Sequence, residues 1–127
     1  MKVLALDYGS ARTGVAVSDP SGTLARPLCV VERADTEAGL TRLRELVEEE
    51  GAERVVVGLP LTLRGTHGEQ ARETERFVES LRAAVDVPIE TFDERFTTTL
   101  AGPGEGDDAR AAAHLLSSYL EWSSRQS

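Results

Sequence analysis

Three acidic residues stand where a carboxylate could do chemistry: Asp7, Glu94 and Asp108. Asp7 closes an apolar run that begins at Val3, Glu94 follows a predicted strand, and Asp108 opens the last predicted helix. Each acid adjoins a segment whose neighbours are expected to be buried, and burying an unpaired carboxylate is costly. A shared metal ion would remove that cost. The sequence therefore predicts a carboxylate cluster that holds divalent metal.

Carboxylate ligands suit Mg²⁺ or Mn²⁺, hard cations that prefer oxygen and keep waters that a substrate phosphate can displace. Two such ions about 4 Å apart could activate a water and stabilise the leaving oxygen in phosphodiester cleavage. Cys29 is the only cysteine of the chain, so a site of several thiolates is excluded. The expected cofactor is therefore Mg²⁺ or Mn²⁺, and the expected reaction is cleavage of a phosphodiester bond.

Each acid also has an ordinary structural interpretation. Asp7 could cap the turn at Gly9, and Glu94 could be a solvated loop charge. The dipole of a helix favours an acid such as Asp108 in the first turn. Its neighbour Asp107 is turned about 100° away and is the better candidate for the helix cap. Asp108 instead shares a face with a stripe expected to be buried, which consists of Ala111, Ala112, Leu115, Tyr119 and Trp122.

The first elements that must position these residues are strands. Val3–Asp7 is a short apolar run, and the turn at 8–10 separates it from a second run at Gly14–Ser18, which predicts a hairpin. Strong turn residues at 19–22 then lead to a third strand at Pro27–Val31. The chain is therefore expected to open with three antiparallel strands.

Helices and strands alternate in the rest of the chain. The expected elements are a helix at 36–50, a strand at Val55–Val57, a helix marked by apolar residues from Ala71 to Leu81, a strand at Val87–Phe92 and a closing helix at about 107–123. The β-branched run at Val55–Val57 is typical of a strand covered on both faces, so it is expected inside the sheet. This order is that of the α/β RNase H-like fold, a five-stranded mixed sheet of three antiparallel strands and then two parallel ones, flanked by helices.

Size and composition agree with one domain. The chain has 127 residues, of which 40% are hydrophobic and 28% charged, and no apolar run reaches the roughly 20 residues that cross a bilayer. We therefore expect a single domain over 1–127, no membrane partner and, because the N-terminus lacks a signal-peptide pattern, a cytoplasmic location. The formal net charge of -8 argues against nucleic-acid binding through a general basic surface. A nucleic-acid substrate would need a local basic patch or a bridging metal.

Five ordered motifs cover almost the whole chain. They are Asp7 to Asp19 (DYGSARTGVAVSD), Val57 to Leu61 (VGLPL), Gly65 with Gln70-Ala71, Asp93 to Thr98 (DERFTT), and Asp108 with Ala111-Ala112 and Tyr119-Leu120. Together they resemble the YqgF/RuvX family of RNase H-like nucleases. The resemblance implies a metal-dependent nuclease related to Holliday-junction resolvases and assigned to trimming the precursor of small-subunit ribosomal RNA. It places the family's catalytic carboxylates on Asp7, Glu94 and Asp108.

One segment departs from the family pattern. Between Thr98 and Asp108 the family usually carries a longer and often basic stretch, whereas this chain has a short segment rich in glycine at 99–107. Because that segment flanks the expected site, its shortening bears on substrate preference more than on catalysis. The sequence leaves both a ribosomal RNA precursor and branched DNA open as substrates.

Arg12, Arg64 and Arg95 are the candidates for a local basic patch beside the carboxylates. Guanidinium groups bind phosphate through two parallel hydrogen bonds, and the hydroxyl of Thr97 could also donate to phosphate. Surface ion pairing and turn capping are the ordinary alternatives. The expected partner is nucleic acid, and a homodimer would match a substrate with two-fold symmetry.

Two other functions share parts of this pattern. Asp7-Tyr8-Gly9 with the following hairpin resembles the phosphate loop of actin-like ATPases and sugar kinases, but that fold encloses nucleotide between two such domains. A noncatalytic RNase H-like adaptor for nucleic acid or protein is the other alternative, although it would gain nothing from three carboxylates that face phosphate. Nucleotide-dependent stabilisation would favour the first, and binding without cleavage in Mn²⁺ would favour the second.

Overall fold

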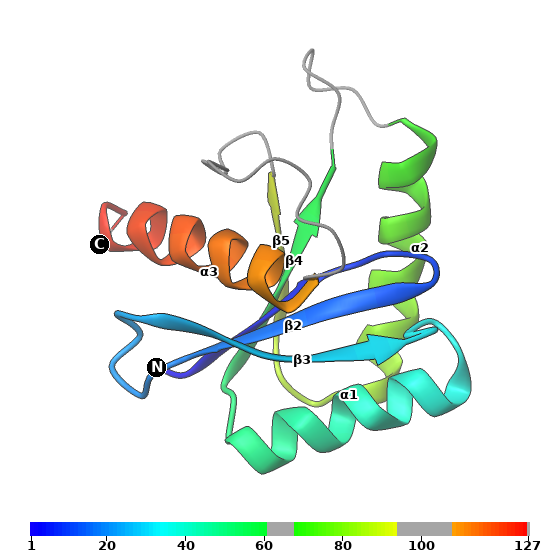
Figure 1. The fold of residues 1–127 in the computed structure, drawn as a ribbon, viewed down its shortest axis with the longest axis horizontal. Helices are drawn as coiled ribbons and strands as arrows, with labels where there is room; N and C mark the ends of the chain where they lie inside the picture. Colours follow the sequence, from blue (N-terminus) through cyan, green and yellow to red (C-terminus); the bar gives the residue numbers. More distant parts are fainter. Residues whose placement is uncertain (61–67, 94–107, 127) are drawn as a thin grey trace.

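A five-stranded mixed sheet forms the centre of the computed structural model, which describes residues 1–60, 68–93 and 108–126 (Figure 1). Its strands are β1 (Val3–Asp7), β2 (Arg12–Ser18), β3 (Ala25–Glu32), β4 (Arg54–Leu59) and β5 (Ile89–Asp93), in the order β3-β2-β1-β4-β5. The β1–β2 and β2–β3 pairs are antiparallel, and the β1–β4 and β4–β5 pairs are parallel. The predicted sheet is confirmed, and β4 lies inside it.

Four strands differ from the predicted limits. β4 covers Arg54–Leu59 rather than Val55–Val57, and β5 covers Ile89–Asp93 rather than Val87–Phe92. β2 begins at Arg12 rather than Gly14, because Arg12 pairs with Glu32 and Thr13 with Val31 across the ladder. β3 likewise runs past both ends of the apolar run, and a register shift between Val15 and Ala16 interrupts its pairing with β2. Hydropathy alone missed the ends of β2 and β3, since backbone pairing lengthens a strand into residues that are not apolar.

Helices α1 (Glu37–Glu50), α2 (Glu69–Ala84) and α3 (Asp108–Ser124) complete the fold. At the start of α1 the Thr36 hydroxyl accepts a hydrogen bond from the Gly39 amide at 3.2 Å. The helix ends at Gly51, whose φ of 66° is the left-handed conformation that glycine adopts without strain. All three helices were predicted from the spacing of apolar residues.

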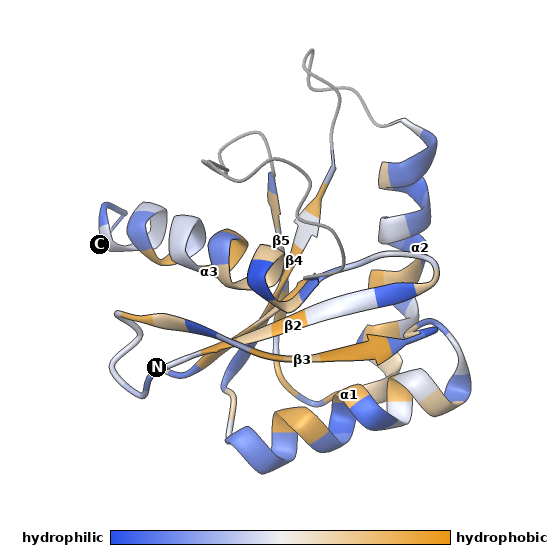
Figure 2. Cartoon of the chain, in the orientation of Figure 1, coloured by the Kyte–Doolittle hydropathy of each residue, from blue (hydrophilic) through white to orange (hydrophobic). Residues whose placement is uncertain are grey.

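The helices cover the two faces of the sheet separately. α3 packs on the face formed by alternate residues such as Val3, Ala5 and Ala16, whereas α1 and α2 pack on the opposite face (Figure 1). Strand periodicity produces this division, since successive side chains point to opposite faces. Figure 2 shows apolar and hydrophilic residues interspersed along α1, as expected for a helix buried on one side.

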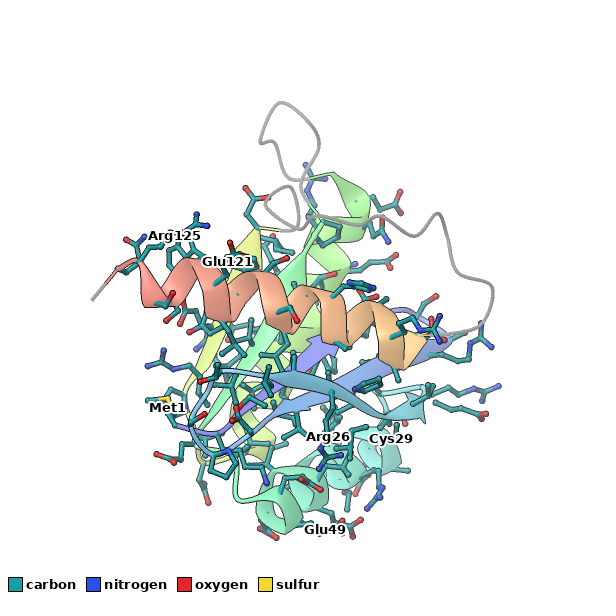
Figure 3. All side chains as sticks on the ribbon, turned by 60° about the vertical axis from the view of Figure 1, so that its left-hand side comes forward. Met1, Arg26, Cys29, Glu49, Glu121 and Arg125 are labelled. Atoms are coloured by element: carbon teal, nitrogen blue, oxygen red, sulfur yellow. The ribbon has the colours of Figure 1, made fainter. Side chains whose placement is uncertain are left out.

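Three of the five residues in the apolar stripe of α3 are buried, and Ala111 is half-buried. Ala112, Leu115 and Tyr119 are 0 to 2% exposed, but Trp122 is 36% exposed. The prediction of a buried Trp122 is therefore wrong: its ring contacts Phe92 at a centroid distance of 5.6 Å and leaves one side open near the helix end. Figure 3 shows neighbouring Glu121 and Arg125, which form an ion pair at 2.6 Å at this end of α3.

None of the helices in the described part of the chain combines the length and apolar character that a membrane span requires.

Candidate carboxylate site

Asp7 is the last residue of β1, where the central strand of the sheet leaves the core. It lies on the same face as Val3 and Ala5, which are 3% and 0% exposed, and it is itself half-buried. Its partner across the β1–β2 ladder is Gly14. The sequence predicted that Asp7 shares a face with Val3 and Ala5, and in the structure α3 covers that face.

Gly14 is the point at which α3 meets the sheet. A Cβ at this position would collide with the carbonyl of Asp108 and lie 2.9 Å from the amide nitrogen of Ala109. The first turn of α3 therefore rests directly on the backbone of β2, at the residue that pairs with Asp7. Asp7 and Asp108, separated by a hundred residues in sequence, are brought to one place through this glycine.

Arg12 and Asp108 form an ion pair at this place. Arg12 Nε lies 3.2 Å from Asp108 Oδ2, with the two side chains 54% and 31% exposed. The contact lacks the geometry of a hydrogen bond, and among the described residues the buried Oδ2 atom has no hydrogen-bond donor. The positive charge of Arg12 thus offsets part of the free-energy cost of burying Oδ2. The lone pairs of Oδ2 accept no hydrogen bond from the described residues.

Thr13 contacts the turn that follows Asp7. The Gly9 amide donates to Thr13 Oγ1 at 3.4 Å, and Thr13 is completely buried. The alternative role considered for Asp7 was to cap this turn at Gly9. The Gly9 amide thus has an acceptor other than the Asp7 carboxylate.

Several predicted site residues lie outside the described part of the chain. These are Glu94, Arg64, Arg95 and Thr97, together with the predicted helix cap Asp107. Within residues 1–60, 68–93 and 108–126, no group of three His, Cys, Asp or Glu side chains is arranged to hold a metal. The described residues therefore supply two of the three predicted carboxylates, and Glu94 directly follows Asp93 at the end of β5.

Gly14 was not singled out for a function from the sequence, although its position carried a signal. A glycine inside a strand often marks a place where another backbone approaches closely. The polar group of Arg54, Glu90 and Tyr119 was also missed: Tyr119 Oη donates to Glu90 at 3.0 Å and accepts from Arg54 at 2.9 Å. No local pattern links these three residues, which are distant in sequence.

Comparison with known proteins gives consistent matches over most of the chain. Residues 1–122 match the family described as "RuvX: Holliday junction resolvase". Relatives from Chloroflexus aggregans, Rubrobacter xylanophilus and Moorella thermoacetica, each named "Putative pre-16S rRNA nuclease", are 46%, 47% and 39% identical over 94%, 94% and 95% of this chain and 92%, 92% and 95% of their own. The first alignment spans 131 positions, more than the 127 residues here, so that relative has residues this chain lacks.

Solved structures share the fold at low identity. Thermus thermophilus RuvC in complex with a Holliday junction substrate superposes with a TM-score of 0.64 at 19% identity, covering 98% of this chain and 96% of RuvC. The fowlpox virus Holliday junction resolvase gives 0.53 at 11% identity, covering 96% and 99%. These likenesses establish the RNase H-like fold.

Proposed function

The chain belongs to the RuvX family, described as Holliday junction resolvase, and from this premise we propose that it is a divalent-metal-dependent endonuclease for structured nucleic acid. Its relatives at 39 to 47% identity are named for the precursor of 16S ribosomal RNA. We therefore propose that precursor, at its 5′ end, as the first substrate, and a four-way DNA junction as the second. A ribosomal RNA substrate would place the protein in the cytoplasm.

The observation that carries the proposal is the buried Asp108 Oδ2, which accepts no hydrogen bond from the described residues and has the Arg12 guanidinium beside it. It belongs to the helix turn that rests on Gly14, the ladder partner of Asp7. Arg12 offsets part of the cost of burying this oxygen, and a cation ligated by the oxygen would offset the rest. An oxygen-ligated cation fits this pair of carboxylates, with Glu94 proposed as the third ligand from the sequence. Mg²⁺ and Mn²⁺ are the ions that this ligand set suits.

The metal would supply an activated water and a positive charge for the leaving oxygen. The chain's own residues hold and orient the reactants. Asp7 belongs to the sheet and Asp108 to the first turn of α3, so the backbone that carries both carboxylates is in place before substrate binds. Arg12, with a largely exposed side chain, is proposed to bind a substrate phosphate, and Arg64, Arg95 and Thr97 are proposed for the same task.

The proposal is tested with Asp7→Asn and Asp108→Asn, which remove a charge and keep the shape. Asp86→Asn is the matched control, since Asp86 is exposed in the connection before β5, at the other end of that strand. We expect both site variants to cleave at least about a hundredfold more slowly in Mn²⁺ than the parent protein. Substituting a residue that only supports a metal ligand typically costs less. Substrates are a ribosomal RNA precursor, a four-way junction, a duplex and a single strand, each with Mg²⁺ and with Mn²⁺.

Two results would contradict the proposal. If Asp7→Asn cut any of these substrates as fast as the parent protein, the carboxylates would not be catalytic. If the parent protein bound RNA or junction tightly in Mn²⁺ and cut neither, the noncatalytic adaptor would be the correct function. The mass of the free protein and of its junction complex, measured by light scattering, tests the expected homodimer.

A further inference from the structure

A pocket of about 380 Å³ lies between the β1–β2 connection and α2. Figure 1 shows this connection beside α2. Its lining includes Tyr8, Ser10, Asp35, Glu73, Arg76 and Phe77. Tyr8 directly follows Asp7 but packs against the core on the α1 and α2 side, so the pocket and the Asp7 carboxylate lie on opposite sides of the same strand end.

One wall of the pocket is aromatic. The rings of Tyr8 and Phe77 stack with centroids 4.4 Å apart and planes 17° apart. Phe77 is 2% exposed, whereas Tyr8 is only half-buried and lines the pocket. Tyr8 also shares a side-chain hydrogen bond with Asp35. The wall is therefore an uncharged, planar surface next to the candidate site.

Charged groups of both signs surround this wall. Asp35 and Glu73 supply carboxylates and Arg76 supplies a guanidinium, and none of the three forms an ion pair with another described residue. Asp35 already accepts a hydrogen bond from the Tyr8 hydroxyl, so the groups available to a ligand are the Glu73 carboxylate and the Arg76 guanidinium. Two carboxylates against one guanidinium make the pocket unfavourable for a phosphate group, which would meet more repulsion than attraction.

We propose that this pocket binds a guanine base splayed out of a single-stranded part of the substrate. A planar base can stack on an aromatic side chain, and single-stranded RNA is recognised in this way. Guanine presents adjacent N1–H and N2–H donors to a carboxylate such as Glu73, and its O6 and N7 accept from a guanidinium such as Arg76. Adenine would instead place its N1 lone pair against the carboxylate.

This inference rests on the proposed function, because the nucleic acid that reaches Asp7 must also supply the base. Asp7 and Tyr8 are consecutive, so a phosphate near the carboxylates and a base near Tyr8 would belong to the same stretch of strand. Ser10, in the connection itself, offers a hydroxyl at the rim of the pocket. The pocket would then select which phosphodiester bond lies at the carboxylates.

The test measures binding separately from cleavage. Fluorescence anisotropy in Ca²⁺, with intact strands verified on a gel, compares oligouridine strands that carry one guanosine, inosine or adenosine. The full chain should prefer guanosine to adenosine by about tenfold, the order of one bidentate contact, and inosine, which lacks N2–H, should fall between them. Glu73→Gln should reduce the preference to less than about threefold. Glu79→Gln, an identical change on an exposed part of α2, should leave it unchanged.

Equal affinity for all three strands, or an undiminished guanosine preference in Glu73→Gln, would overturn the inference. Tyr8→Leu provides a second readout, since loss of stacking should weaken all three strands, whereas an unchanged affinity would count against a stacked base. The nuclease proposal is tested separately, by the cleavage assay with Asp7→Asn. A protein that cleaves without base preference refutes only the pocket, and one that discriminates bases without cleaving refutes only the nuclease.

Discussion

Gly14 of β2 and Asp108 of α3 are in direct backbone contact, and this contact sets the position of the helix relative to the end of β1. We predict that Gly14→Ala lowers the free energy of unfolding by about 1–3 kcal/mol, because the new methyl group must push α3 off the sheet. The same displacement should weaken Mn²⁺ binding. Urea unfolding and isothermal titration calorimetry measure the two effects.

The control for Gly14→Ala is Gly51→Asn. Gly51 has a φ of 66° but no heavy atom within 4 Å of where its Cβ would lie, and asparagine tolerates the left-handed conformation. This variant should keep Mn²⁺ affinity within error. A Gly14→Ala protein as stable as the parent, with equal metal affinity, would show that α3 does not depend on this contact.

Arg12 should have opposite effects on metal and on nucleic acid. Its guanidinium lies 3.2 Å from an oxygen of the proposed metal ligand Asp108, so it competes with a cation there. Arg12→Gln should therefore tighten Mn²⁺ binding by roughly two- to fivefold, the size of a partly exposed ion pair. It should also weaken binding of a ribosomal RNA precursor, because a phosphate contact is lost. Calorimetry and anisotropy measure the two affinities.

Arg26→Gln is the matched control for Arg12→Gln. Arg26 is also a strand arginine paired with an acid, Glu50 at 3.6 Å, but it lies on β3 near the other end of β2. Neither affinity should change in this variant. If Arg12→Gln changed metal and RNA affinity in the same direction, the proposed competition would be incorrect.

Much of the fold was predictable because each element carries its own periodicity. The alternation in β1 placed Asp7 on the side of the sheet that α3 covers, and the helical spacing placed Asp108 at the start of a buried stripe. What local periodicity does not contain is the docking of α3 on Gly14. That contact joins residues far apart in sequence, and because glycine has no side chain, a hydropathy pattern does not indicate it.

The candidate site was predictable in part for the same reason. Asp7 and Asp108 were chosen by position within elements, and the structure brings them to one end of the sheet. Glu94 lies outside the described residues and stays a prediction. The stacking of Tyr8 on Phe77 was not predicted, because the two residues belong to different elements. Taken singly, each is typical of an aromatic residue packed in the core.

Tyr119→Phe should destabilise the fold without affecting the carboxylate site. The Tyr119 hydroxyl, on a side chain only 2% exposed, links Arg54 and Glu90 across α3, β4 and β5. Removing it leaves the ring in place but loses two hydrogen bonds, one to each charged group, which should cost about 1–3 kcal/mol of unfolding free energy. Urea unfolding measures this change, while Mn²⁺ affinity should match the parent. An unchanged stability would show that water replaces the hydroxyl at no cost.

Asp19 should make the stability depend on pH in the acid range. Its pKa is lowered from 3.8 to about 2, first by the hydrogen bond from the Ser21 hydroxyl and then by the amides of Leu24 and Thr23. A carboxylate with a lowered folded-state pKa stabilises the protein above its unfolded value, and this stabilisation is lost as pH falls through the folded value. Asp19→Asn should therefore be less stable than the parent above pH 4, and the difference should shrink from about pH 4 toward pH 2. Urea unfolding across that range, with the exposed Asp86→Asn as charge control, measures it, and a difference independent of pH would assign the effect to turn geometry instead.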